Sequence, residues 1–118
     1  MAPAAGQGDY PEIKLYIDGQ WTGGTSSRGD DVVNPATEEV LGRVPFAEPG
    51  DVAAAIAAAK EAFPTWRDAG PDFRSGILLK AAALLHQRAD EIGRVMTMEE
   101  GKPLAEAAGE VHRAATGL

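Results

Sequence analysis

The sequence contains no cysteine, and this absence excludes several kinds of chemistry. Without cysteine the chain has no disulfide framework, no cysteine-ligated zinc or iron–sulfur cluster, and no thiolate nucleophile. No apolar run approaches the roughly 18 residues that a membrane-spanning helix needs. Residues 1–8 lack the basic and apolar regions of a signal peptide. We therefore expect a cytoplasmic protein that does not associate with membranes.

Positive charge is also scarce. The 118 residues include 11 Lys and Arg against 18 Asp and Glu, which gives a formal net charge of −7. A polyanion such as DNA is repelled by that balance, and no basic run offers a local exception, so we expect no nucleic-acid partner. Apolar and charged residues make up 44% and 25% of the chain, as in ordinary globular proteins, and the length allows one domain at most.

The first part of the chain has the pattern of a small β region within residues 13–46. Residues 1–10 are small, rich in glycine and proline, and aperiodic, which predicts a flexible tail. Apolar runs on both sides of Asp18-Gly19 predict a β-hairpin, because these two residues tolerate the positive φ of a type I′ turn. The remaining predicted segments are a polar loop at 23–31 and short strands at 32–33 and 39–44.

The pattern changes at Asp51, after which apolar residues recur at steps of three and four. That period, with Asp51 as the N-cap, predicts a helix over residues 51–66. Pro64 lacks the backbone N–H that a helix interior needs, so we expect the helix to end or kink there.

A second periodic segment predicts helical structure over residues 71–101, with a kink or a joint between two helices at Gly93. Gly101 is expected to close it with a positive φ, and Pro103 to open a last helix over residues 103–118. The chain is therefore expected to be mainly α-helical, with a small N-terminal β-hairpin region.

The sequence contains no glycine motif typical of nucleotide binding and no histidine spacing typical of a metal site. No G-x-G-x-x-G follows a predicted strand, and Gly101-Lys102 lacks the upstream glycine and the Ser or Thr of a phosphate-binding loop. His86 and His112 show no metal-ligand spacing, so we expect surface histidines rather than ligands.

Other candidate residues have simpler structural explanations. Arg28-Gly29-Asp30 is the tripeptide found in cell-adhesion ligands, but we expect it to be part of a solvated loop without that function. Trp21 and Trp66 are expected to pack in a core or between domains. Four carboxylates surround the glycine turn without a nucleophile or metal cluster, so we interpret them as charged helix ends: Glu99, Glu100, Glu106 and Glu110. The residues alone predict no catalytic, cofactor-binding or metal site.

Five motifs nevertheless follow one another along the chain. They are Leu-Tyr-Ile-Asp-Gly-Gln-Trp at 15–21, Val-Asn-Pro-Ala-Thr-Glu-Glu-Val-Leu-Gly at 33–42, Ala-Phe-Pro-Thr-Trp at 62–66, Arg74 leading into Ile77-Leu78, and Met-Thr-Met-Glu-Glu-Gly-Lys-Pro-Leu-Ala-Glu-Ala at 96–107 with Gly109-Glu110-Val111 after it. In this order they resemble the opening of NAD(P)-dependent aldehyde dehydrogenases. The last motif most resembles the succinate-semialdehyde dehydrogenase branch.

The resemblance implies an α/β fold and an oxidoreductase in the intact protein. In that family a cysteine attacks the aldehyde, hydride passes to NAD or NADP, and a glutamate activates the water that hydrolyses the thioester. The resemblance covers only about the first quarter of the family's length, and those groups lie beyond Leu118. Residues 11–118 are thus expected to form the N-terminal part of such a domain, truncated at its C-terminus, inactive alone and binding no cofactor alone.

The resemblance also implies partners. The intact enzyme takes a small aldehyde and forms homo-oligomers, and this chain is expected to self-associate through apolar helix faces. Some family members hold an alkali cation at positions that correspond here to Val33 and Glu99, although an ordinary surface carboxylate is the expectation for Glu99. Two rival hypotheses are a stand-alone helical interaction module and a small enzyme with a site of its own. The second rival is weaker because no nucleophile–base pair is visible.

Overall fold

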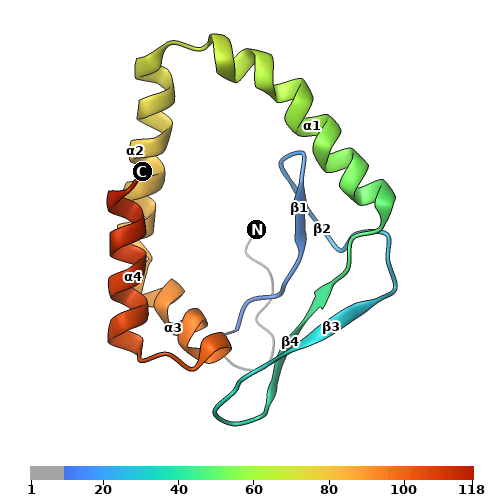
Figure 1. Ribbon diagram of the computed structural model, residues 1–118, viewed down its shortest axis with the longest axis vertical. Coiled ribbons are helices and arrows are strands. Elements are labelled where there is room, and N and C mark those ends of the chain that lie inside the picture. Colours follow the sequence, from blue (N-terminus) through green and yellow to red (C-terminus); the bar gives the residue numbers. More distant parts are fainter. Residues whose placement is uncertain (1–9) are drawn as a thin grey trace. The chain divides into compact units, whose positions relative to one another are not determined.

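The computed structural model describes residues 10–118, in which short strands precede helices (Figure 1). The strands are β1 (Leu15–Ile17), β2 (Gln20–Thr22), β3 (Gly29–Val33) and β4 (Val40–Pro45). The helices are α1 (Pro49–Asp68), α2 (Pro71–Gln87), α3 (Ala89–Glu100) and α4 (Leu104–Thr116). This confirms the expected helix-rich segment with a small β region. Apart from Tyr10, the predicted tail lies outside the described residues.

The chain forms two compact units. The first contains all four strands and α1, and the second contains residues 34–38 with α2, α3 and α4. Each unit has its own packing and is described by itself below.

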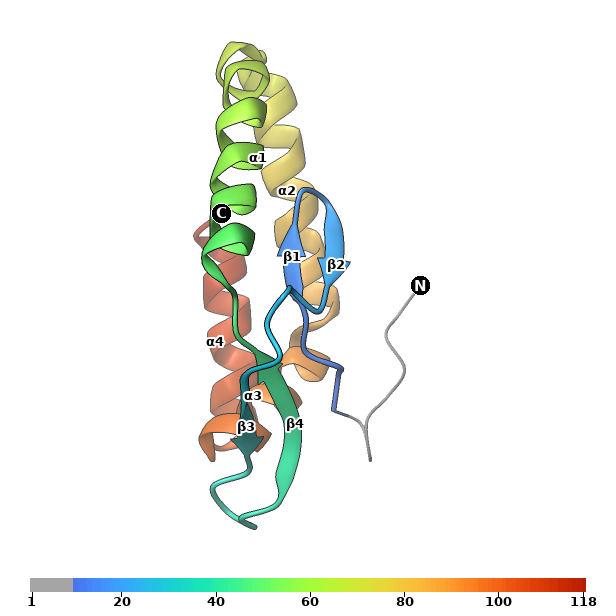
Figure 2. The ribbon, with the colours of Figure 1, turned by 90° about the vertical axis from the view of Figure 1, so that its right-hand side faces the viewer.

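The predicted hairpin of the first unit is confirmed. β1 and β2 pair in antiparallel fashion, and the two turn residues Asp18 and Gly19 have φ values of 51° and 72°. Tyr16 and Trp21 lie directly opposite each other, with ring centroids 4.8 Å apart. Such cross-strand aromatic pairs stabilise two-stranded sheets. β1 also contacts α1, beside which the hairpin lies in Figure 2.

The second strand pair is longer than the sequence predicts. β3 begins at Gly29 and pairs with β4 in antiparallel register, with Asp30 opposite Val44 and Asp31 opposite Arg43. The predicted loop over residues 23–31 is therefore wrong for its last three residues. Aspartate disfavours strands by itself, but the ladder with β4 overrides that local preference.

Helix α1 extends beyond the predicted 51–66 at both ends. It begins at Pro49, so Asp51 is not the N-cap but lies in the first turn. It continues through Pro64 to Asp68, so the predicted end at that proline is wrong. Proline removes one intrahelical hydrogen bond, and here the helix on both sides remains formed around that loss.

In the second unit the predicted segment 71–101 is two joined helices, as expected, but the joint is not at Gly93. It lies at Arg88, whose φ and ψ of −102° and 9° separate α2 from α3. Gly93 is instead buried inside α3, where a Cβ would lie 3.0 Å from the backbone nitrogen of Ala108 in α4. The glycine serves close helix packing rather than a kink.

The predicted helix end at Gly101 is confirmed. Its φ is 75°, and its N–H donates to the carbonyl oxygen of Thr97 at 2.9 Å. Such a left-handed residue is the usual stop of a helix. α4 then begins at Leu104, one residue later than predicted, with Pro103 just before it.

α4 packs against α3 and α2 (Figure 1). Its buried residues recur at steps of four and are at most 5% exposed: Ala107, Val111 and Ala115. The small side chains allow close approach of the helices. In the first unit the buried aromatic residue is Tyr10, whose ring packs against Gly42.

Many large apolar side chains stay exposed on α1 and α2. They are Val52, Ile56, Phe63, Trp66, Phe73, Ile77, Leu78, Leu79 and Leu84. Within the described residues, no helix combines the length and apolar character that spanning a membrane requires.

Candidate functional site

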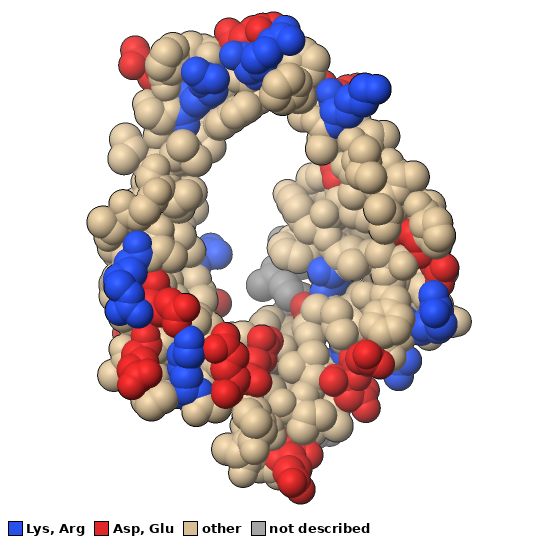
Figure 3. All heavy atoms as spheres, in the orientation of Figure 1, with Lys and Arg blue, Asp and Glu red and all other residues tan. Residues whose placement is uncertain are grey.

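The turn between α3 and α4 brings Lys102 together with two of the four carboxylates that the sequence singles out. The ammonium group of Lys102 pairs with Glu100 at 3.2 Å and donates a hydrogen bond to Glu110 in the second turn of α4. Figure 3 shows acidic and basic side chains next to one another over this region. The pairing fixes the start of α4 relative to the end of α3.

The electrostatics of this turn oppose proton transfer near neutral pH. The hydrogen bond from Lys102 lowers the pKa of Glu110, and the hydrogen bonds to Glu110 and then Glu100 raise the pKa of Lys102. A general acid or base works best with a pKa close to the working pH, and both shifts move away from it. The turn is therefore a structural ion-pair cluster, as expected for charged helix ends.

The other two carboxylates of the predicted group, Glu106 and Glu99, are not among the ion-pair partners of Lys102. Glu106 is exposed in the first turn of α4, where the helix dipole stabilises a negative charge. Glu99 is exposed at the end of α3. Val33 belongs to the first unit and Glu99 to the second, so the cation site implied for them stays a prediction.

Asp51 has the most developed polar environment in the first unit. It is 8% exposed, and its Oδ2 accepts hydrogen bonds from the backbone N–H of Glu48 at 2.9 Å and from both the N–H and the hydroxyl of Thr25. The N–H of Glu48, then that of Thr25, lowers the pKa of this carboxyl group. Asp51 thereby anchors the loop after β2 to the start of α1, and its ionised state suits that structural role.

The adhesion-like tripeptide is not a free loop. Gly29 and Asp30 belong to β3, so the expected solvated loop is wrong for these two residues. Arg28 pairs with Glu48 at 3.1 Å and lies over the ring of Phe46 at 5.9 Å. These contacts hold the chain where it enters the strand.

The two tryptophans are not core residues. Trp21 is 67% exposed and Trp66 39% exposed, so the expected core packing is wrong. The alternative, packing between domains, stays a prediction.

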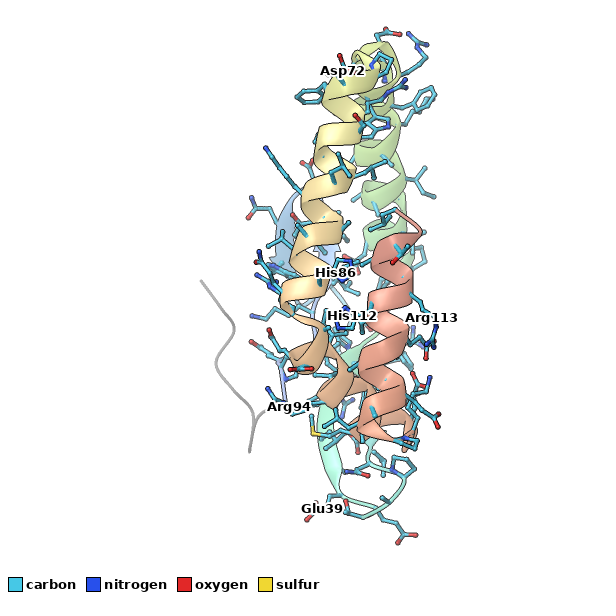
Figure 4. The ribbon with its side chains drawn as sticks, turned by 90° about the vertical axis from the view of Figure 1, so that its left-hand side faces the viewer. Glu39, Asp72, His86, Arg94, His112 and Arg113 are labelled. Atoms are coloured by element: carbon cyan, nitrogen blue, oxygen red, sulfur yellow. The ribbon has the colours of Figure 1, made fainter. Side chains whose placement is uncertain are left out.

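The structure brings His86 and His112 together, which sequence reasoning missed. The two rings come from α2 and α4 and point toward each other (Figure 4), with Nδ1 atoms 2.8 Å apart and ring centroids 5.1 Å apart. Both residues are exposed, which confirms surface histidines. No signal in the sequence places them together, because their proximity arises from helix packing. Among residues 10–118, no cluster of three or more His, Asp or Glu residues is arranged to hold a metal ion.

The chain is similar to known proteins over most of its length. The model of the aldehyde dehydrogenase family matches residues 21–118. The mitochondrial acylating methylmalonate-semialdehyde/malonate-semialdehyde dehydrogenase of Rattus norvegicus is 44% identical over 103 residues, which are 87% of this chain and 19% of that protein. The chain thus spans about a fifth of the length of the curated relatives that it matches.

Solved structures agree with the sequence comparison. A putative methylmalonate-semialdehyde dehydrogenase of Sinorhizobium meliloti 1021, complexed with NAD, superposes with a TM-score of 0.84 and 36% identity over 92% of this chain and 22% of that one. A succinate-semialdehyde dehydrogenase of Burkholderia pseudomallei superposes with a TM-score of 0.83 and 39% identity, over 87% of this chain and 21% of that one. Solved structures similar to this chain contain NAD in some cases and NADP in others.

Proposed function

Since the chain belongs to the aldehyde dehydrogenase family, we propose that it forms the N-terminal part of an NAD(P)-dependent enzyme that oxidises an aldehyde to a carboxylic acid. The family match over residues 21–118 carries this proposal. The chemistry proceeds through a thioester on a cysteine, and these 118 residues contain no cysteine. The described segment therefore acts as scaffold, and the nucleophile belongs to a part of the enzyme outside it.

The residues present do not fit the dinucleotide cofactor. A dinucleotide binds at the carboxyl ends of parallel strands, with its pyrophosphate on a glycine-rich turn at a helix N-terminus. In residues 10–118 the strands form two separate antiparallel pairs, and neither α2, which begins at Pro71, nor α4, which follows Pro103, is preceded by such a turn. NAD or NADP is proposed for the whole enzyme and not for this segment alone.

The proposed substrate is a semialdehyde of a short dicarboxylic acid. The names of the relatives at 40–45% identity are malonate-semialdehyde and methylmalonate-semialdehyde dehydrogenases, and a succinate-semialdehyde dehydrogenase follows at 39%. These identities support the malonate type ahead of the succinate type that the motif at 96–107 suggests. The three substrates share a carboxylate at the far end from the aldehyde, so a substrate panel must vary both chain length and the methyl branch.

A second candidate function is a helical interaction module with no activity of its own. Its support is the exposed apolar side chains on each of α1 and α2, such as Phe63 and Leu79. Soluble monomers rarely expose contiguous apolar patches beyond a few hundred Å². The same side chains suit the enzyme proposal, in which the remainder of the enzyme and its oligomer cover them.

Two experiments test the proposal. Purified 118-residue chain should bind no NAD(P)⁺ and show no NAD(P)⁺-dependent oxidation of malonate, methylmalonate or succinate semialdehyde. Turnover that persists across independent preparations would overturn it. The coding DNA beyond Leu118 separates the two candidates, because an open frame leading to a glycine-rich turn and a cysteine supports the enzyme. A stop codon there, with a monomeric and cooperatively folded chain, would favour the module.

A further inference from the structure

The His86–His112 pair joins two helices that the sequence separates, and its geometry has no role in the proposed enzyme chemistry. One Nδ1 donates a hydrogen bond to the other at 2.8 Å, and the rings stack with 27° between their planes. We propose that this pair is a binding site for a divalent transition-metal ion, in which both Nδ1 atoms coordinate the ion and water fills its other positions.

The helices hold the two rings in place before any ion binds. On α4, His112 lies between buried Val111 and buried Ala115, so the backbone on both sides of it is fixed against α3 and α2. His86 is the second-last residue of α2, and buried Ala89 opens α3 three residues later. A site on packed helices keeps its ligands at a defined separation, so less ordering is needed on binding.

The separation of the nitrogens in the metal-free pair is close to that of one coordination geometry. With metal–nitrogen bonds of about 2.0–2.1 Å, ligands at a right angle lie about 2.9 Å apart, whereas tetrahedral ligands lie about 3.4 Å apart. The observed 2.8 Å matches the right angle. Tetragonal geometry is that of Cu²⁺ and Ni²⁺, and imidazole suits both ions.

The chemistry of binding needs no other partner. The ion takes the place of the proton shared by the two Nδ1 atoms, and that proton moves through solvent to the Nε2 of the same ring. Each imidazole therefore stays neutral and keeps one N–H. Both rings are exposed, so their Nε2–H groups can donate to water.

The neighbours of the two histidines one turn away on their own helices are small. One turn from the histidines on their own helices stand small residues: Ala82 and Ala83 on α2, and Ala108 and Ala115 on α4. Arg113, the basic neighbour of His112, points away from the pair in Figure 4. The net charge of −7 further favours a cation over an anion.

The test is titration of the 118-residue chain with Cu²⁺, followed by calorimetry and electron paramagnetic resonance. The chain should bind one ion at this site, with two imidazole nitrogens in the spectrum. His86→Gln and His112→Gln should each weaken binding about 100-fold, because either change converts a chelate into a single ligand. Gln87→Ala, which changes an exposed neighbour, should leave the affinity unchanged.

Both histidines are exposed and glutamine is a good helix former, so the variants should fold as the parent does, which circular dichroism checks. The proposal is wrong if the His86→Gln/His112→Gln double variant keeps the affinity and spectrum of the parent. It is also wrong if only one of the single substitutions weakens binding, or if the parent chain does not bind Cu²⁺.

Discussion

Replacing Gly93 with alanine should destabilise the second unit, although the same change stabilises an ordinary helix. In a helix interior, Gly→Ala contributes about 1 kcal/mol of stability. At Gly93 the added Cβ would lie 3.0, 3.2 and 3.3 Å from the backbone nitrogen, Cα and Cβ of Ala108. These are backbone and short side-chain atoms that cannot rotate away, so α4 must move.

The magnitude follows from the two opposing effects. Overpacking a well-packed contact costs about 1–3 kcal/mol, and we take about 2 kcal/mol for one methyl group against backbone. Subtracting the propensity gain leaves a net loss of about 1 kcal/mol for Gly93→Ala. Gly76 in α2 is the matched control, because a Cβ there would meet nothing within 4 Å. Gly76→Ala should stabilise by about 1 kcal/mol, so the two variants should differ by about 2 kcal/mol.

The assay is urea unfolding of both variants and the parent, with hydrogen exchange of the α4 amides as a local readout. Hydrogen exchange reports the α3–α4 contact even if unfolding is not two-state. Gly93→Ala should lower the urea midpoint and speed exchange in α4, and Gly76→Ala should raise the midpoint. Equal stabilisation by both alanines would refute the close approach of α4 to Gly93.

Three further predictions concern the turns and the apolar surface. Gly101→Val should destabilise by about 2 kcal/mol in urea unfolding, because a β-branched residue resists the positive φ there; an unchanged midpoint would contradict this. The pKa of Asp51 is lower in the folded than in the unfolded chain, so ionised Asp51 stabilises the folded state. This stabilisation is complete above the unfolded pKa of about 4 and is lost as the pH falls through the lower pKa of the folded state. Melting temperatures measured at a series of pH values should fall less steeply below pH about 4 for Asp51→Asn than for the parent. Equally steep falls for the two proteins would argue against this role of Asp51. The isolated chain should self-associate in sizing chromatography and bind a hydrophobic dye, whereas a clean monomer with a sharp transition would not fit the exposed faces.

Local chemistry determined the features that the sequence could predict. The turns at Asp18-Gly19 and Gly101 need a positive φ, and few residues supply it, so their positions were predictable from residue type. The five motifs were enough to identify the family, because their order and spacing are specific in combination.

Packing determined the features that the sequence could not predict. Pro64 weakens a helix locally, yet α1 continues past it, and Gly93 marks a helix contact rather than a joint. Thr25, one of the two partners of Asp51, lies 26 residues away in the chain, and the two histidines meet only because α4 returns alongside α2. Periodicity along one segment carries no information about such contacts between segments.

If this chain is the N-terminal scaffold of an aldehyde dehydrogenase, as proposed, it should serve as that part of a complete enzyme. The most direct measurement is the activity of a chimera in which residues 21–118 replace the matched segment of the Sinorhizobium meliloti enzyme. We predict a folded chimera that forms NADH with methylmalonate semialdehyde, whereas the 118-residue chain alone forms none. A chimera that folds and binds NAD but forms no NADH, or activity of the isolated chain, would contradict the claim.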